Sequence, residues 1–255
     1  MIDVKGVTHV YAGGTPAIND VTLQIHNGEF VSVVGPSGCG KTTLLNLIAG
    51  LVELQEGSIT LAKKAPKAGR HDVAYMLARD CLFPWRKALD NVMLGGEFRD
   101  VPRSERREHA LKLLAKVGLR GFEEHYPKAL SQGMRQRVAL ARTFSLDSQI
   151  LLMDEPFGAL DAQTKLQLEG TLLDLWTAHK RTVVFITHDL TEAVMLSDRV
   201  VVMSSRPGRI LADIQIPLHR PRSVRALQKD PRYHEICSEV WTRLEQALNK
   251  EGVGL

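Results

Sequence analysis

Short apolar runs alternate with stretches of helical spacing along most of this chain of 255 residues. Runs rich in valine, leucine and isoleucine occupy residues 31–34, 150–153, 183–186 and 199–203. This pattern is typical of strands that are buried on both faces of a sheet. Residues 1–34 alternate like antiparallel strands, and the Asn-Gly pair within His26–Glu29 predicts a hairpin turn between strands at 21–25 and 30–34.

The middle and the end of the chain have different patterns. Residues from about 86 to 145 have mainly helical spacing, and a Pro/Arg-rich connection at 219–222 precedes a predicted helix from about 233 to 250. The turn Ser205–Gly208 is expected to join the strand at 199–203 to the next strand. Strands that alternate with helices predict a mostly parallel sheet, with a ligand site at the carboxyl ends of its strands.

One loop between a strand and a helix has a chemical signature. Gly35–Thr42, GPSGCGKT, satisfies the G-x-x-x-x-G-K-[ST] pattern of a phosphate-binding loop. Its glycines allow successive N–H groups to surround one anion, and a helix that begins at Lys41 adds the positive end of its dipole. Lys41 is expected to reach the β- and γ-phosphates, and the Thr42 hydroxyl to ligate Mg²⁺. Glycine-rich turns also occur without a ligand, but here the strand, loop, Lys-Thr pair and helix agree. The expected phosphate-binding residues are Gly35, Pro36, Ser37, Gly38, Cys39, Gly40, Lys41, Thr42 and Thr43.

Composition adds little to this picture. The apolar fraction of 44% is ample for a core, and the formal net charge of +4 suits a nucleotide, an anionic lipid surface or a nucleic acid equally well. The three cysteines lie far apart, which favours a reducing compartment over a disulfide framework. We find no signal-peptide pattern and no apolar run long enough to cross a bilayer.

Two adjacent carboxylates, Asp154 and Glu155, end the apolar run 150–153. A single acid in this position could be a helix cap or half of an ion pair. Beside a phosphate loop, Asp154 can hold Mg²⁺ while Glu155 orients and polarises the attacking water. Consecutive strand residues point to opposite faces, so separate roles suit this pair.

Several motifs then occur in a fixed order: Lys41-Thr42, the segment LSQGMRQR at 130–137, LLMDEP at 151–156, FGALD ending at Asp161, and Thr187-His188-Asp189. Together they resemble the nucleotide-binding subunit of an ATP-binding cassette (ABC) transporter, over nearly the whole chain. The resemblance implies a phosphate-loop NTPase fold: an α/β core with a mostly parallel sheet flanked by helices, an N-terminal antiparallel β part and an inserted helical subdomain. It also implies ATP hydrolysis with ATP and Mg²⁺ as the bound groups.

The resemblance assigns roles to single residues. Two subunits would enclose two ATP molecules head to tail, and Ser131 and Gly133 would contact the γ-phosphate bound by the partner's phosphate loop. Asp161 would lie at the dimer seam or serve simply as a helix N-cap. His188 would contact the γ-phosphate, although a lone histidine after a strand is more often structural. Tyr11 resembles the aromatic residue that stacks on adenine, although a tyrosine at a strand end is often only packing.

The sequence departs from the family pattern in two places. Gln132 replaces the first of two glycines that the family usually has in LSQGMRQR. The loop before the helical region normally contains a glutamine that touches Mg²⁺ and couples the site to the membrane partner. Alignment on Phe83–Trp85 places Ala78 there, and no glutamine lies between Gln55 and Gln132. We expect weaker organisation of Mg²⁺ or altered coupling.

Finer features narrow the resemblance to the importers of nitrate, sulfonates, taurine and bicarbonate: the Pro84-Trp85 pair, the form LSxGMRQR, and Pro221-Arg222-Ser223. An importer subunit would lie on the cytoplasmic face of the cell (inner) membrane. Its partners would be a second ATPase subunit, identical or not, an integral-membrane permease docked near residues 78–98, and, through the complex, an extracytoplasmic solute-binding protein. Phe83, Pro84 and Trp85 are the candidates for the permease contact, unless they only pack internally.

The expected domains are an ATPase domain over 1–220, with a helical subdomain at about 86–145, and a C-terminal helical extension over 221–255. The alternative function is a soluble ABC ATPase that acts on nucleic acid or ribosomes, but the coiled-coil insertion, zinc modules or tandem cassettes usual in such proteins are absent from this sequence. No nucleic-acid partner is therefore expected. A small-molecule kinase would use the same loop but would leave LSQGMRQR and His188 unexplained.

Overall fold

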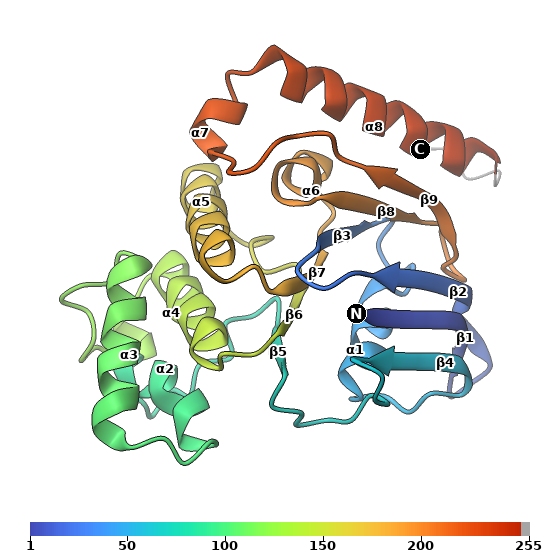
Figure 1. Ribbon diagram of the computed structural model, residues 1–255. Coiled ribbons are helices and arrows are strands. Elements are labelled where there is room, and N and C mark those ends of the chain that lie inside the picture. Colours follow the sequence, from blue (N-terminus) through green and yellow to red (C-terminus); the bar gives the residue numbers. More distant parts are fainter. Residues whose placement is uncertain (251–255) are drawn as a thin grey trace. The chain divides into compact units, whose positions relative to one another are not determined.

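The computed structural model describes the backbone of residues 1–250 and the side chains of residues 1–246 (Figure 1). Residues 251–255 of the predicted C-terminal extension lie outside the described residues. The chain divides into two compact units: the first combines residues 1–70 with the chain from Lys180 onward, and the second is the continuous stretch His71–His179.

The N-terminal strands of the first unit form an antiparallel sheet of three strands, in the order β2-β1-β4. The strands are β1 (Ile2–Tyr11), β2 (Thr15–Ile25) and β4 (Glu56–Leu61). Alternate residues of β1 and β2 are buried, as the sequence pattern predicts for a sheet with one face on the core. This sheet is the predicted antiparallel part of the fold.

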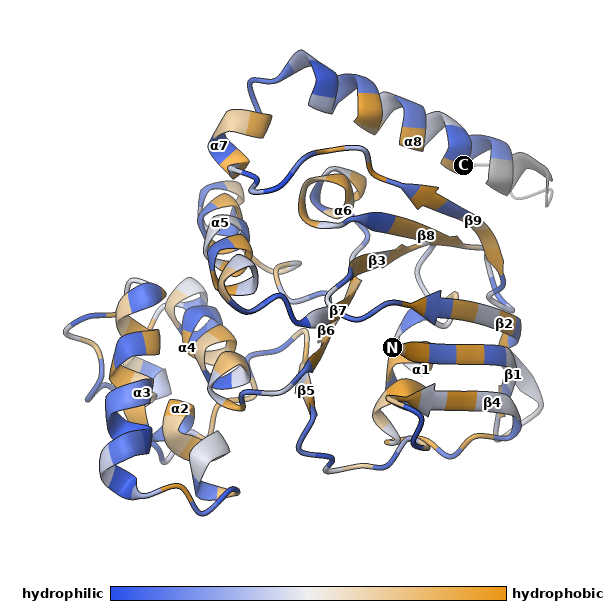
Figure 2. Cartoon of the chain, in the orientation of Figure 1, coloured by the Kyte–Doolittle hydropathy of each residue, from blue (hydrophilic) through white to orange (hydrophobic). Residues whose placement is uncertain are grey.

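The remaining strands of the first unit are β3 (Phe30–Val34), β7 (Thr182–Ile186), β8 (Arg199–Met203) and β9 (Ile210–Gln215). β3 lies between β7 and β8 and is parallel to both, while β9 pairs antiparallel with β8. Every residue of β3, β7 and β8 is buried, which explains why these strands are mainly apolar, with Ser32, Thr182 and Arg199 as the polar exceptions (Figure 2).

The hairpin predicted at His26–Glu29 is wrong. β2 pairs with β1, whereas β3 pairs with β7 and β8, so the turn connects two different sheets. The Gly28 N–H donates to the Thr182 hydroxyl at 3.0 Å, a bond to β7. The local Asn-Gly signal fixes a reversal of the chain but not which strands pair, because both edges of β3 are hydrogen-bonded to strands from far along the sequence.

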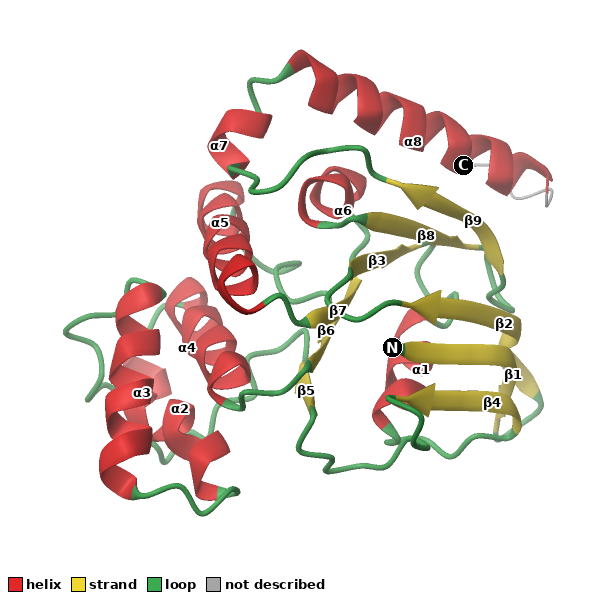
Figure 3. Ribbon diagram, viewed as in Figure 1, coloured by secondary structure: helices red, strands yellow, loops and turns green. Residues whose placement is uncertain are grey.

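In the described part of the first unit, four helices accompany these strands: α1 (Lys41–Ala49), α6 (Leu190–Leu196), α7 (Val224–Leu227) and α8 (Pro231–Lys250). α8 packs against α6 and β9 (Figure 3). Tyr233, Ile236 and Val240 are buried and fall on one face of α8, at the spacing expected of an amphipathic helix. The predicted terminal helix is therefore confirmed, beginning two residues earlier than expected.

The second unit joins two parallel strands, β5 (Val73–Met76) and β6 (Ile150–Asp154), to a group of helices. The helices are α2 (Ala88–Glu97), α3 (Arg103–Lys116), the short 3₁₀ helix η1 (Pro127–Ala129), α4 (Gln132–Ser145) and α5 (Ala162–His179). α2, α3 and α4 pack on one another, which confirms the predicted helical region. No helix within the described residues is long and apolar enough to span a membrane.

Candidate functional site

The phosphate loop lies between the end of β3 and the start of α1, as the sequence predicts. Gly38 and Gly40 have φ angles of 77° and 98°, a left-handed conformation that side-chain-bearing residues rarely adopt. A Cβ at Gly40 would lie 2.4 Å from Cγ2 of Ile18. Both the conformation and the close approach of β2 therefore require glycine at position 40.

Lys41 is folded back over the loop. Its side chain is only 6% exposed, and Nζ donates to the carbonyls of Gly35 at 2.8 Å and Pro36 at 2.9 Å. The ammonium is thus held at the centre of the loop, where a phosphate can exchange for the carbonyls. Thr42, the next residue, is exposed at the beginning of α1.

One further residue, which the sequence did not single out, packs against the loop. Gly208, in the turn between β8 and β9, lies so close to the loop that a Cβ there would be 1.9 Å from the Cys39 carbonyl oxygen. Gly208 is also bonded to β2, because its N–H donates to the Ala17 carbonyl at 2.9 Å. The only sequence signal was a Pro-Gly pair, which predicts a turn but not the approach of a second backbone.

Tyr11 ends β1 and is 42% exposed. Its hydroxyl lies 3.1 Å from Oγ1 of Thr43, and the edge of the His9 ring meets the tyrosine ring with a centroid distance of 4.8 Å. The structure therefore brings this exposed aromatic ring to the phosphate loop, with its hydroxyl anchored there.

His188 follows β7 and is exposed. The next residue, Asp189, is the N-cap of α6: its carboxylate accepts hydrogen bonds from the N–H groups of Thr191 and Glu192. The Thr187 N–H donates to the Val33 carbonyl at 3.3 Å, which ties the segment before His188 to β3, the strand that leads into the phosphate loop.

The two predicted catalytic carboxylates belong to the second unit. Asp154 ends β6 and is 8% exposed. Burial, together with the negative charge of Asp154, raises the pKa of Tyr75 on β5. Glu155 lies beyond the strand with φ 44°, so the argument from alternating strand faces was wrong. A left-handed conformation is strained for a residue with a side chain, and such strain is concentrated at functional sites.

The segment LSQGMRQR begins α4. Ser131 is its N-cap, and the serine oxygen accepts a hydrogen bond from the Met134 N–H at 3.2 Å. A Cβ at Gly133 would lie 2.7 Å from the Thr164 methyl group. Asp161 accepts from the Thr164 N–H at 2.9 Å, and its hydrogen bonds to Thr164 lower the pKa of Asp161. The predicted helix-capping role of Asp161 is confirmed.

The two departures from the family pattern meet in one pocket of the second unit. Ala78 and Gln132 both line this cavity of about 420 Å³, and so do Arg135 and Asp80, which form an ion pair at 2.9 Å. Gln136 also lines it and donates to the Pro156 carbonyl, next to Glu155. Both replacements thus border one space that connects the Ala78 loop with the start of α4.

The donor groups fit Mg²⁺. Within the described residues no three His, Cys, Asp or Glu side chains gather as a complete metal site. Mg²⁺ is commonly held by one or two protein oxygens together with phosphates and water. Each unit offers one predicted hard oxygen of this kind: the Thr42 hydroxyl at the start of α1 in the first, and the Asp154 carboxylate at the end of β6 in the second.

The geometry of the loop, with its lysine and the helix that follows, defines the class of protein. It is a phosphate-loop nucleotide-binding protein. Comparison with known sequences gives the family. Residues 18–158 match the sequence model of the ABC transporter family, so the match spans more than half of the chain. The chain belongs to the ABC transporter family.

Two relatives illustrate the similarity. The chain is 49% identical over 224 residues to an uncharacterised ABC transporter ATP-binding protein of Methanocaldococcus jannaschii, covering 87% of this chain and 84% of the relative. It is 43% identical over 246 residues to the taurine import ATP-binding protein TauB of Escherichia coli K12, covering 93% of this chain and 96% of TauB.

A solved structure with the same fold is the dimeric ATP-binding cassette in a post-hydrolysis state bound to ADP and Pi. It has a TM-score of 0.77 and 32% identity, and covers 86% of this chain and 100% of the cassette. The fold predicted from the sequence is thus confirmed. The chain is an ATPase of the ABC family, with ATP and Mg²⁺ as its bound groups.

Proposed function

We propose that this chain is the ATP-hydrolysing subunit of an importer for a small solute of the nitrate, sulfonate or taurine type. The observation that carries this proposal is the likeness to TauB, a taurine import ATP-binding protein, over 93% of this chain and 96% of the relative. Full-length similarity matters because it includes the C-terminal segment with Pro221-Arg222-Ser223, beyond the residues that match the family model.

Each predicted residue has a physical role in hydrolysis. The loop N–H groups and Lys41 bind the phosphates, and the Tyr11 ring stacks on the base. Glu155 orients the attacking water and accepts its proton, while His188 contacts the γ-phosphate. Mg²⁺ held by Thr42 and Asp154 neutralises charge on the phosphates.

The working form is a head-to-tail dimer in which Ser131 and Gly133 of one subunit cover the γ-phosphate bound by the other. Ser131 supports this role because it is exposed and caps a helix of 14 residues, whose N-terminus favours an anion. Glu155→Gln should retain ATP binding and lower kcat by about a hundredfold or more, because the water loses its base.

That variant also tests the dimer. With ATP and Mg²⁺, Glu155→Gln should shift from monomer to dimer in light scattering, since the closed state is no longer released by hydrolysis. The matched control is Glu155→Gln combined with Ser131→Ala, which should dimerise less. Wild-type hydrolysis by Glu155→Gln would refute the role of Glu155, and a monomer at saturating ATP would refute the dimer.

The permease contact is proposed at the segment from residue 78 to 98. Trp85 is 70% exposed, and its ring lies 5.2 Å from that of Phe83. Arg86 lies over the Phe83 ring at 5.8 Å, so the two aromatic rings are held together on the surface. An exposed tryptophan supported by a half-buried ring is a good anchor for an interface, because tryptophan is enriched among the residues that carry binding energy.

Trp85→Ala should therefore abolish solute uptake in cells while the ATPase activity of the purified subunit stays at the wild-type level. The exposed Trp241→Ala on α8 is a control for loss of a surface tryptophan. Equal uptake by the two variants would contradict the proposed contact.

The importer itself is tested by purification from membranes solubilised in detergent. We expect the chain to lie on the cytoplasmic face of the cell membrane and an integral-membrane permease to co-purify with it. Cells that lack the chain should lose uptake of the nitrate-, sulfonate- or taurine-type solute. The solute-binding protein joins through the permease, and specificity belongs to those subunits. Stable binding to nucleic acid or ribosomes without a membrane partner would favour the alternative function.

We also propose the division into an ATPase domain at 1–220 and a C-terminal extension.

A further inference from the structure

His188 is followed by a helix that is too short to be stable alone. α6 has seven residues, Leu190–Leu196, and isolated helices of this length do not form in water. Its conformation therefore depends on groups that bind its two ends. Both ends are bonded by residues that follow β9, in the segment from Arg220 to Tyr233.

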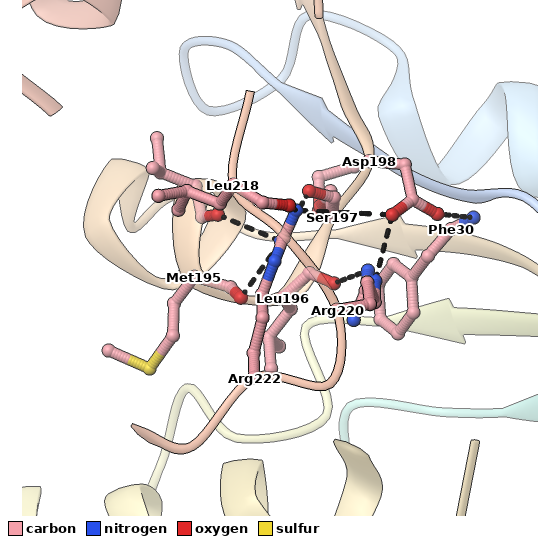
Figure 4. Close-up of polar contacts among 10 residues, drawn as sticks. Phe30, Met195, Leu196, Ser197, Asp198, Leu218, Arg220 and Arg222 are labelled. Atoms are coloured by element: carbon pink, nitrogen blue, oxygen red, sulfur yellow. Dashed lines mark hydrogen bonds and ion pairs between the residues drawn. The ribbon is translucent and has the colours of Figure 1, made fainter. Parts of the chain in front are cut away.

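The C-terminal end of α6 is held by two arginines (Figure 4). Arg222 donates to the carbonyls of Met195 at 3.1 Å and Ser197 at 2.7 Å, and Arg220 donates to that of Leu196 at 2.6 Å. The Arg220 guanidinium also pairs with Asp198 at 2.8 Å. These donors satisfy carbonyls that a helix end leaves without intrahelical partners.

The same cluster reaches the strand of the phosphate loop. The second carboxylate oxygen of Asp198 accepts a hydrogen bond from the Phe30 N–H at 3.0 Å, at the start of β3. The Arg220 guanidinium lies 5.9 Å from the centre of the Phe30 ring. The end of α6 and the beginning of the strand that leads to Gly35 are thus fixed to one ion pair.

The N-terminal end of α6 is held by a network on both sides of His188. Thr187 donates its hydroxyl hydrogen to Glu192, and the same oxygen accepts from the Asp189 N–H at 3.0 Å. Asp189 in turn accepts from the N–H and the hydroxyl of Thr191 at 2.9 and 2.6 Å. Thr187 and Glu192 are nearly inaccessible to solvent, so water does not compete for these bonds.

Tyr233 connects this network to the C-terminal helix. Its hydroxyl donates to the Thr191 carbonyl at 2.9 Å, and the residue is only 3% exposed. Since α8 packs against α6, displacement of α8 would remove this bond. A path of hydrogen bonds from Tyr233 to the residue after His188 therefore runs through Thr191 and Asp189.

We propose that Tyr233 is a positioning residue for His188: the C-terminal helix holds the first turn of α6 and thereby the angle at which His188 meets the γ-phosphate. This inference rests on the proposed role of His188. Thr191 and Asp189 transmit the effect, and Tyr233 itself does not touch the nucleotide. The segment after β9 consequently affects catalysis through the position of His188, in addition to packing against the sheet.

The test is Tyr233→Phe in the full chain, with steady-state ATPase kinetics and amide hydrogen exchange. We expect kcat to fall about fivefold, the factor that corresponds to one ordinary hydrogen bond, with KM for MgATP unchanged. Amides of residues 187–192 should exchange faster. Thr242→Val is the control, because the exposed Thr242 hydroxyl donates to a carbonyl of the same helix, Ser238, at 2.9 Å.

A purely structural role would predict a different result. If Tyr233→Phe leaves kcat at the value of Thr242→Val, or if KM rises along with a fall in Tm, the inference is wrong. His188→Ala, measured in parallel, separates the two proposals. Wild-type kcat in His188→Ala would refute the role of His188 itself, whereas an impaired His188→Ala beside a normal Tyr233→Phe would refute only the positioning by Tyr233.

Discussion

Replacement of Arg222 by methionine should destabilise the first unit strongly, because this side chain bonds a helix end from inside the protein. The Arg222 side chain is 1% exposed, and its guanidinium donates to the carbonyls of Val194, Met195, Ser197 and Leu218. Methionine has a similar length and fills most of the space, so the change removes the donors while leaving little cavity.

The magnitude follows from two opposing effects. Each lost hydrogen bond costs about 1 kcal/mol, and carbonyls that stay buried without a donor cost at least as much. Against this, removal of a buried cation relieves an unfavourable charge, since burial and the neighbouring Arg220 lower the pKa of Arg222 to about 10. We expect a net loss of about 2–3 kcal/mol in the free energy of unfolding.

Urea denaturation followed by circular dichroism, with amide exchange of α6 as a local probe, measures this loss. Arg225→Met is the matched control, since Arg225 is exposed only three residues further along the chain. Its midpoint should match the wild type, because exposed substitutions of this kind change stability by less than about 0.5 kcal/mol. Equal midpoints for Arg222→Met and Arg225→Met would refute the reasoning that the four bonds hold α6.

Three further changes test the nucleotide site. Lys41→Ala should weaken MgATP binding by about tenfold or more in a fluorescence titration, because a charge-assisted bond to phosphate is lost; unchanged affinity would contradict its place in the loop. Gly208→Ala should raise KM for ATP, because the new methyl group would collide with the Cys39 carbonyl; a crystal structure with an undisturbed loop would disprove the collision. Ala78→Gln should lower the Mg²⁺ concentration that gives half-maximal ATPase activity, and identical ATPase and uptake in this variant would remove the hypothesis about the missing glutamine.

The phosphate loop and the parallel strands were predictable from the sequence because local rules determine them. Gly35–Thr42 combines glycines, a lysine and a helix start in consecutive residues, so these residues alone determine the local conformation of the backbone. Likewise, strands that are buried on both faces are near-continuous apolar runs, which marks most of β3, β7 and β8 directly.

Interactions between distant segments could not be predicted in this way. The Asn-Gly turn at 27–28 was expected to make a hairpin, but the partners of β3 come from much later in the chain. Glu155 lies in a left-handed turn that no local pattern signalled, since glutamate has no preference for that conformation. Gly208 and Tyr233 act through close approach and a single bond, and their sequence context indicates only a turn and a helix.

The pairing of β3 also determines when, during synthesis, the protein can form its nucleotide-binding site. A ribosome releases the chain from its N-terminus, and β3 has no neighbour until β7 and β8, which begin at Thr182 and Arg199, have emerged. Residues 71–179, the whole of the second compact unit, emerge before that moment. The phosphate loop therefore leaves the ribosome early, but the sheet that positions it for a nucleotide is complete only late in translation.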